Sequence, residues 1–352
     1  MGGSRSSTRL SLLRRLLLAV CLSTTGGLAL AACDLGSAYQ PLVEEIPEVA
    51  GDPGAALLAF SVAADMRSYL GPFGANTAKE FRSALDALQA AGPGSFLLSP
   101  GDIDPPYDGD PLTDDVHAAV QDRLGPGFPW FPVIGNHEAE TPSDMAGLRA
   151  YPIQAQGGGA ADYRAGPVHA AENCYSFTAG GARFVVINEY YDGISDTGPF
   201  PGASEAGRIH PSLYAWLEAE LAYAETLHPA YLFVIGHEPV YPLPDEASGR
   251  LRHRGDSLDI HKDEAIAFVD LLKAHDVTAY LCGHTHNYSA ALVDGVAQID
   301  AGHARGTGDT GAPSTFLRLV LYDNFAEMLV HRSTDGVAYA PEAKVVRLLP
   351  RP

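Results

Sequence analysis

The sequence has little positive charge. It contains 23 Lys and Arg against 43 Asp and Glu, and its formal net charge is −20. A protein that binds nucleic acid or an anionic membrane surface does so through a basic face, so this composition argues against either partner. The sequence also has no internal repeats. Hydrophobic residues make up 46% of its 352 positions, which is enough for a large core and, at this length, for one or two domains.

Cysteine is scarce as well, with four in the chain. Cys21 and Cys33 lie in the N-terminal segment, so only Cys174 and Cys282 remain for the folded part. Outside the cytosol these two thiols could pair as a disulfide, or each could stay as a buried free thiol. The sequence leaves both possibilities open.

The first 32 residues have the pattern of an export signal. Four Arg precede an apolar run from Leu16 through Leu30, which small residues close. The run is too short and too interrupted by Gly and Thr for a membrane span. Leu30-Ala31-Ala32-Cys33 resembles a bacterial lipobox, which implies cleavage before Cys33 and a lipid on its sulfur. The alternative is a plain secretory signal with an incidental Cys. We expect an exported protein, lipid-anchored to the bacterial cell envelope and facing outside the cytoplasm.

The rest of the chain divides into a tether and one folded domain. Residues 33–54 are rich in Pro, Glu and Gly without periodicity, which is typical of a flexible tether. Residues 55–350 alternate apolar runs with helical patterns, which predicts βαβ units and a single α/β domain. Residues 139–172 show no clear period and are predicted as loops that shape a substrate opening. The predicted strands cover 55–64, 95–99, 131–134, 174–177, 183–188, 231–235, 277–282, 297–299, 315–322 and 325–330; the predicted helices cover 77–91, 114–124, 211–227 and 263–275.

Residues able to bind metal ions follow several of the predicted strands. They are Asp65, Asp102, Asn136, His137, His237, His284 and His286. The carboxyl ends of strands in open α/β sheets meet where ligands bind. Carboxylates and imidazoles gathered there can hold two metal ions, with one carboxylate bridging ions ~3.5–4 Å apart around a phosphoryl group. Taken alone, the stretch Gly283-His284-Thr285-His286 could also be a loop with two polar residues.

Four motifs resemble those of the calcineurin-like metallophosphoesterases over residues 55–335. They are Gly101-Asp102, Gly135-Asn136-His137-Glu138, Gly236-His237 and Gly283-His284-Thr285-His286. Residues 174–188 and Tyr288 are further similar to the purple acid phosphatase branch. The resemblance implies a four-layer α/β/β/α sandwich with two mixed sheets. It also implies a metal-dependent phosphoesterase, which hydrolyses phosphate esters by attack of a metal-bound hydroxide.

The resemblance divides the ligands between two metal ions, which would be Fe, Mn or Zn. Asp102 would bridge them. Asn136, His237 and His284 would complete one ion, and Asp65 and His286 would belong to the other. His137 would protonate the leaving oxygen or stabilise developing charge.

The first motif departs from the family pattern. Where the family has Asp-x-His, this chain has Asp65-Met66-Arg67, and Arg is not a metal ligand because it stays protonated. The purple branch has a Tyr three residues after its bridging Asp, but that position here is Pro105, and Tyr107 is out of register. One ion therefore lacks a ligand, so water, Tyr107 or another group fills the gap, or the ion binds weakly. Arg67 could instead hold phosphate oxygens, or pair with an Asp.

Other residues near the motifs are expected to support the ligands: Asp104, Glu138, Tyr241 and His303. The remaining histidines, His253 among them, are expected at the surface or in structural roles. The acidity of the chain favours small phosphorylated substrates over nucleic acid. The motifs do not separate monoesters from diesters; we expect a phosphomonoesterase and a monomeric protein. A phosphodiesterase, or a catalytically impaired lipid-anchored binding protein with the same fold, is the alternative.

Overall fold

The computed structural model describes residues 40–41, 54–66, 77–103, 112–140, 142–198, 206–305 and 311–352. The chain divides into two units, Met1–Asp34 and Leu35–Pro352, and the fold described is that of the second. The predicted export signal, Cys33 and Arg67 lie outside the described residues, as do Asp104 and Tyr107. Within the described residues, no helix combines the length and the apolar character that crossing a membrane requires.

Two mixed sheets carry the fold. In the described part of the chain, the larger has eight strands in the order β1 (Gln40–Pro41), β10 (Tyr288–Val293), β11 (Val296–Ala301), β9 (Ala279–Cys282), β8 (Tyr231–Ile235), β7 (Ala182–Val186), β6 (Tyr175–Ala179) and β5 (Ala161–Ala165). The smaller has six: β14 (Ala340–Leu348), β13 (Ala326–Ser333), β12 (Ser314–Leu321), β2 (Leu58–Val62), β3 (Leu97–Ser99) and β4 (Trp130–Pro132). The neighbours β7, β8, β9 and β11 run parallel, as do β2, β3 and β4. These parallel strands deliver their carboxyl ends to one edge of each sheet.

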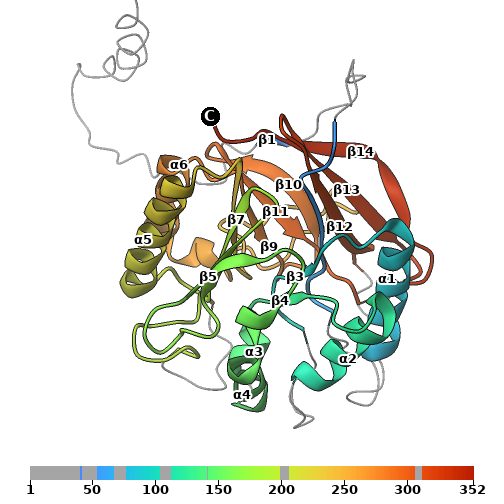
Figure 1. Ribbon diagram of the computed structural model, residues 1–352, viewed down its shortest axis with the longest axis horizontal. Helices are drawn as coiled ribbons and strands as arrows, with labels where there is room; N and C mark the ends of the chain where they lie inside the picture. The colour runs from blue at the N-terminus through green and yellow to red at the C-terminus, as the bar shows by residue number, and fades with distance from the viewer. Residues whose placement is uncertain are drawn as a thin grey trace, which may run out of the picture. The chain divides into compact units, whose positions relative to one another are not determined.

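Helices lie on the outer sides of the sheets (Figure 1). The long ones are α1 (Thr77–Ala91), α2 (Leu112–Leu124), α5 (Pro211–Leu227) and α6 (Lys262–Ala274). The short ones are α3 (Asn136–Glu140), α4 (Pro142–Ala150), η1 (Ile153–Ala155) and η2 (Leu258–Ile260). Helix α5 begins with Pro211 in its first turn, where a missing N–H costs nothing, and the His210 side chain accepts a hydrogen bond from the Ser212 N–H.

Aromatic rings join the two sheets face to face. Phe60 of β2 lies 5.2 Å from Phe184 of β7 and 5.7 Å from Phe233 of β8, ring centroid to ring centroid. On the other side of the larger sheet, Val234 of β8 belongs to a second buried cluster with Leu217 of α5 and residues of α6. The predicted arrangement of two mixed sheets with helices is therefore confirmed.

Residues 139–172 are more regular than predicted. They contain all of α4 and all of β5, and the prediction of loops throughout is wrong there. Helix α4 buries Met145 and Leu148, which are three residues apart. This helical spacing is hard to recognise in the sequence, because the helix is short and contains Gly147 and two Ala. Strand β5 shows no buried and exposed alternation, because four of its five side chains are exposed. Within the predicted tether, Gln40 and Pro41 pair with Leu292 and Ala291 at the edge of the larger sheet.

Candidate metal centre

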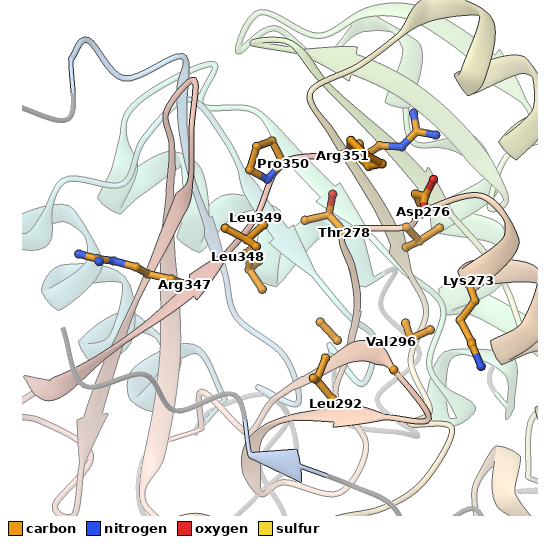
Figure 2. Close-up of a pocket in the computed structure, with 14 residues that line it drawn as sticks. Lys273, Asp276, Thr278, Leu292, Val296, Arg347, Leu348, Leu349, Pro350 and Arg351 are labelled. Carbon is orange, nitrogen blue, oxygen red and sulfur yellow. The ribbon is translucent and has the colours of Figure 1, made fainter. Parts of the chain in front are cut away.

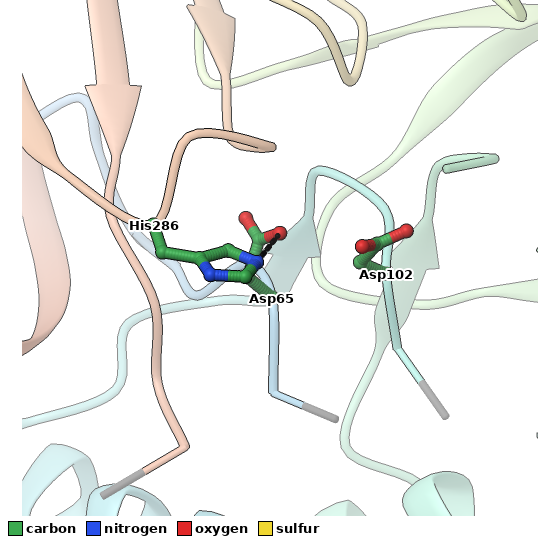
Figure 3. Close-up of side chains that lie close together, drawn as sticks. All are labelled: Asp65, Asp102 and His286. Carbon is green, nitrogen blue, oxygen red and sulfur yellow. Dashed lines mark ion pairs between the residues drawn. The ribbon is translucent and has the colours of Figure 1, made fainter. Parts of the chain in front are cut away.

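The predicted ligand positions all follow strands of the two sheets: Asp65 after β2, Asp102 after β3, Asn136 and His137 after β4, His237 after β8, and His284 and His286 after β9. Asp65, Asp102 and His286 are buried, and each offers one ligand atom within 4.8 Å of the others (Figure 3). His286 and Asp65 face each other directly, with Nε2 and Oδ1 3.3 Å apart. The structure thus brings residues far apart in the sequence to one centre.

His237 turns its Nε2 toward this centre. Its Nδ1 lies 2.8 Å from the carbonyl oxygen of Pro100, which can only accept, so Nδ1 carries a hydrogen. Its Nε2, which has a lone pair in the neutral ring, lies 3.4 Å from Asp102 Oδ1 and 3.3 Å from Asn136 Oδ1. An imidazole fixed in this tautomer by a carbonyl is the usual state of a metal-binding His.

His284 presents an unprotonated nitrogen to His237. Its Nε2 lies 3.1 Å from the carbonyl oxygen of Asp256, so Nε2 carries the hydrogen. Burial and the neighbouring His237 hold the pKa of His284 well below its usual range, so the ring is neutral. Its Nδ1 lies 3.2 Å from His237 Nε2. A proton on His237 Nε2 would make this contact a hydrogen bond, and a metal ion could take the place of that proton.

The three distances from His237 Nε2 to its neighbours are of the size that separates ligands of one ion. Ligands ~2.0–2.1 Å from a tetrahedral ion lie about 3.3 Å from one another, and the three contacts of His237 Nε2 are 3.4, 3.3 and 3.2 Å. Two imidazole nitrogens, a carboxylate and an amide oxygen suit zinc, iron or manganese. Asp102, Asn136, His237 and His284 are therefore the residues that would hold the ion.

Buried carboxylates add to the need for positive charge. Asp65 is fully buried, and burial, followed by the charges of Asp102 and Asp300, raises its pKa well above the usual range. Its Oδ2 accepts a hydrogen bond from the His284 N–H at 2.8 Å, while its Oδ1 has no hydrogen-bond donor among the described residues. A cation near this oxygen would restore the ionised form.

The backbone at these turns is held in an unusual conformation. Asp65, Asp102, His284 and His286 have φ of 49°, 52°, 70° and 57°, the left-handed region, which costs roughly 1–3 kcal/mol for each non-Gly residue. Gly283 allows the two sheets to approach here, because a Cβ at this position would lie 2.5 Å from Asp65 Oδ2. The strained turns direct their side chains to one point.

Two buried glutamates hold the turns in place. Glu138 accepts hydrogen bonds from the backbone N–H groups of Asp102, Ile103 and Gly135 at 2.8–2.9 Å. Burial, then the charge of Asp102, raises the pKa of Glu138 to about 8. We expected Glu138 to accept from a ligating imidazole; among its described contacts it supports the backbone around Asp102 instead. Glu189 accepts from the His237 N–H at 2.7 Å, and burial raises its pKa to about 7.

His137 lies at the edge of the centre with a side chain that is 19% exposed. Its Nε2 lies 3.7 Å from Asp102 Oδ2, and its Nδ1 lies 3.4 Å from Glu140 Oε2. A group that gives a proton to a substrate must reach both the solvent-facing opening and the reacting atoms. His137 is partly exposed and lies beside Asp102.

Sequence reasoning missed three residues that reach the centre from loops. Nη atoms of Arg252 and Arg305 contact Nδ1 of His286, the latter at 3.0 Å. The ring of His253, expected to be surface or structural, lies 4.3 Å from the ring of His284. The basic stretch 250–254 was a visible signal, but nothing in its spacing showed which turn it would contact.

Two expected supporting residues have other contacts. Tyr241 donates its backbone N–H to the Gln298 side chain, and the guanidinium of Arg254 lies 5.0 Å above its ring. His303 Nε2 contacts the carbonyl oxygen of Ala312 at 3.1 Å, with its ring centroid 6.1 Å from that of His286.

A cavity of about 440 Å³ lies away from this centre (Figure 2). It is lined by Thr278, which precedes β9, and by the C-terminal residues Leu348 to Pro352, so it lies at the opposite end of β9 from His284. Two of its lining cations already form ion pairs: Lys273 with Asp294 at 3.3 Å and Arg347 with Glu327 at 3.4 Å.

Comparisons with known proteins agree with this geometry. The family model for calcineurin-like phosphoesterases matches residues 49–288. No curated protein sequence matches the chain. Among solved structures, purple acid phosphatase PPD1 from yellow lupin is 14% identical, with a TM-score of 0.52 over 84% of this chain and 54% of that chain. PhoD is 12% identical, with a TM-score of 0.51 over 83% and 69%, respectively.

A third similar structure is GAP50, the anchor in the inner membrane complex of Plasmodium, at 16% identity and a TM-score of 0.48 over 84% of this chain and 90% of that chain. The chain spans about half the length of the lupin phosphatase. At their identities, the lupin phosphatase and PhoD show a shared fold. The family model covers more than half of the sequence, including every motif from Asp65 to His286, and the chain belongs to the calcineurin-like phosphoesterase family.

Proposed function

We propose that this chain is a metal-dependent phosphomonoesterase acting on small phosphorylated substrates. The observation that carries the proposal is the convergence of His237 Nε2 and His284 Nδ1, 3.2 Å apart, beside Asp102 and close to Asp65 and His286. A metal ion can bind between these side chains. A metal ion there would polarise a phosphoryl oxygen and lower the pKa of a water molecule toward neutrality.

Different residues of the chain then bind the ion and transfer the proton. Asp102, Asn136, His237 and His284 hold the ion, and the carbonyl oxygens behind the two imidazoles fix their tautomers. His137, partly exposed and beside Asp102, delivers a proton to the departing alkoxide oxygen. Contact with Glu140 keeps the hydrogen on Nδ1 when Nε2 has given its proton away.

The preference for small monoesters rests on charge. The net charge of −20 repels long polyanions at low ionic strength. The basic stretch 250–254 beside the centre attracts a compact dianion locally. A monoester carries more negative charge on its phosphoryl group than a diester does, so it gains more from these cations.

The test is hydrolysis of p-nitrophenyl phosphate and of bis(p-nitrophenyl) phosphate by protein loaded with Mn²⁺, Zn²⁺ or Fe. We expect faster turnover of the monoester. Asp102→Asn should abolish turnover with the fold retained, as measured by circular dichroism. His137→Gln should reduce turnover by roughly 10²–10⁴-fold while metal content stays unchanged. A faster diester reaction would change the substrate class, and loss of metal in His137→Gln would make His137 a structural residue.

We also propose export and lipid anchoring through Cys33, in a monomeric protein. The support is the sequence pattern that ends at Leu30-Ala31-Ala32-Cys33. Mass spectrometry of protein from a bacterial membrane fraction should find a lipid-modified N-terminal Cys33, and Cys33→Ser should shift the protein to the soluble fraction. An unmodified mature N-terminus at another residue would refute the anchor.

A further inference from the structure

The turn between β9 and β10 carries His286 into the metal centre. The backbone of His286 has a φ of 57°, in the left-handed region, which costs roughly 1–3 kcal/mol for a non-Gly residue. Its Nε2 lies 3.3 Å from Asp65 Oδ1, and the ligand atoms of Asp65, Asp102 and His286 lie within 4.8 Å of one another. The position of the His286 ring therefore depends on the contacts that hold this strained turn.

Arg250 contacts the turn at two consecutive residues. Its Nη2 donates a hydrogen bond to the carbonyl oxygen of His286 at 3.1 Å, and its Nε donates to Asn287 Oδ1 at 2.8 Å. Because a guanidinium is planar, its donors have fixed relative directions, and two such bonds fix both the distance and the orientation of what they hold. A Cβ at Gly311 would overlap the Arg250 side chain, so this Gly leaves the space that Arg250 occupies.

The hydrogen bonds continue from Asn287 to the larger sheet. The Asn287 N–H donates to Thr285 Oγ1 at 3.1 Å, and Thr285 Oγ1 lies 2.5 Å from Asp300 Oδ2 of β11, to which it donates. Thr285, Asn287 and Asp300 are almost fully buried, where hydrogen bonds are stronger than in water. The turn is thus tied to β11 on one side and to Arg250 on the other.

The loop that carries Arg250 is itself anchored. The carbonyl oxygen of Arg250 accepts a hydrogen bond from the Asp245 N–H at 2.8 Å. The Asp245 side chain is buried, accepts from the Tyr288 N–H at 3.0 Å and contacts Nη2 of Arg332 in β13. Arg250 therefore acts on the turn from a loop that is bound to the start of β10 and to the smaller sheet.

We infer that Arg250 is a positioning residue, which holds the backbone of His286 so that its Nε2 stays beside Asp65 and Asp102. The resemblance to the family makes His286 the single histidine of the Asp65 half, because position 67 holds Arg where the family pattern has His. Metal affinity then depends on Arg250, which acts on the ion through His286. An effect on hydrolysis rests on the proposed function; the effect on metal affinity does not.

Binding of Mn²⁺ alone tests the inference without a turnover assay. The chelator-treated, full-length mature protein is titrated with Mn²⁺, and the electron paramagnetic resonance signal of the free ion gives the Kd. His286→Ala identifies the binding step to which His286 contributes, and Arg250→Gln should weaken the same step at least about tenfold. Arg250→Lys keeps one donor for the His286 carbonyl and should recover most of the affinity. Equal Kd values for Arg250→Gln and wild type would overturn the inference.

Arg254→Gln is the matched control in the same stretch. Arg254 is exposed, and its guanidinium lies 5.0 Å above the ring of Tyr241. This variant should bind Mn²⁺ as the wild type does. An equal loss in Arg254→Gln and Arg250→Gln would assign the effect to the charge of the stretch and refute a role of the Arg250 hydrogen bonds.

A double variant separates positioning from a loss of stability. In the His286→Ala background, Arg250→Gln should weaken Mn²⁺ binding by less than about twofold, because the residue through which Arg250 acts is gone. Urea unfolding in EDTA gives the stability of each variant independently of metal binding. If the two losses of affinity multiply in the double variant, Arg250 acts by another route and the inference fails.

The inference and the proposed function fail in different ways. A wild type that binds Mn²⁺ without hydrolysing either ester, with weaker binding in Arg250→Gln, would support the role of Arg250 and refute the enzyme. A wild type that hydrolyses the monoester, with equal Mn²⁺ affinity in Arg250→Gln, would support the enzyme and refute the role of Arg250.

Discussion

Replacing Glu189 with Gln should make the protein's stability less dependent on pH. Glu189 is buried behind His237, and its Oε1 accepts three hydrogen bonds, from the N–H of His237 at 2.7 Å, the N–H of Glu238 at 3.2 Å and the hydroxyl of Tyr280 at 2.8 Å. Its Oε2 has no hydrogen-bond partner among the described residues. A Gln can keep the accepting oxygen and place its amide where Oε2 lies.

The magnitude follows from the pKa of Glu189. Burial raises it from 4.5 to about 7 in the folded, metal-free protein, and one pKa step corresponds to ~1.4 kcal/mol. The folded protein therefore keeps a proton that the unfolded chain loses, and stability falls as the pH rises from about 4.5 to about 7. The loss is about 3 kcal/mol in total. Gln has no proton to lose, so the variant escapes this decrease.

The assay is urea unfolding of wild type and Glu189→Gln in EDTA at pH 5 and pH 9, followed by circular dichroism. At pH 5 the variant should be less stable by about 1–3 kcal/mol, because its amide is buried without an acceptor. At pH 9 the free energy of unfolding of the variant, relative to that of the wild type, should be about 3 kcal/mol more favourable than it is at pH 5. Glu218→Gln, at an exposed position of α5, is the matched control. A stability difference that is the same at both pH values would refute the reasoning.

Three further predictions concern local contacts. Gly283→Ala should lower the free energy of unfolding by about 1–3 kcal/mol, because the new Cβ would lie 2.5 Å from Asp65 Oδ2. Thermal or urea unfolding measures this loss. An unchanged stability would contradict the close approach of the two residues. Cys174 and Cys282 are buried free thiols. In the absence of reductant, both should therefore react with a thiol reagent once the protein is unfolded, and neither should react while it is folded. A missing thiol in the unfolded protein would reveal a disulfide. Asn136→Ala should weaken metal affinity at least about tenfold in a competition assay with a chromogenic chelator, and an unchanged affinity would remove Asn136 from the ligands.

The strands that precede the candidate ligands, and the ligands at their ends, could be predicted from the sequence because both depend on local patterns. Residues 231–235 form an apolar run of strand length, and His237 follows it after a single Gly. Helices α1 and α5 have the predicted bounds, since each combines a helical period with a clear stop or start signal. The positions that bind or approach the metal then follow from the geometry of parallel strands.

The residues that reach the centre from loops could not be predicted in the same way. Arg252 and Arg305 lie 53 residues apart in the numbering, and no period relates either one to His286. Their contacts depend on how two irregular segments pack after the sheets have formed. The position of Glu189 could have been noticed in the sequence, because Glu189 follows the buried residues of β7 as Asp65 follows those of β2. A carboxylate after a strand can support the backbone as well as bind a metal.

The most direct test of the account is the hydrolysis of p-nitrophenyl phosphate by wild type and Asp102→Asn, measured together with metal content on the same samples. The account predicts that chelator-treated wild type is inactive and regains turnover with added metal, and that Asp102→Asn remains folded and shows no turnover at any metal concentration. Equal turnover in the two proteins, or no turnover by the metal-loaded wild type on either the monoester or the diester, would contradict it.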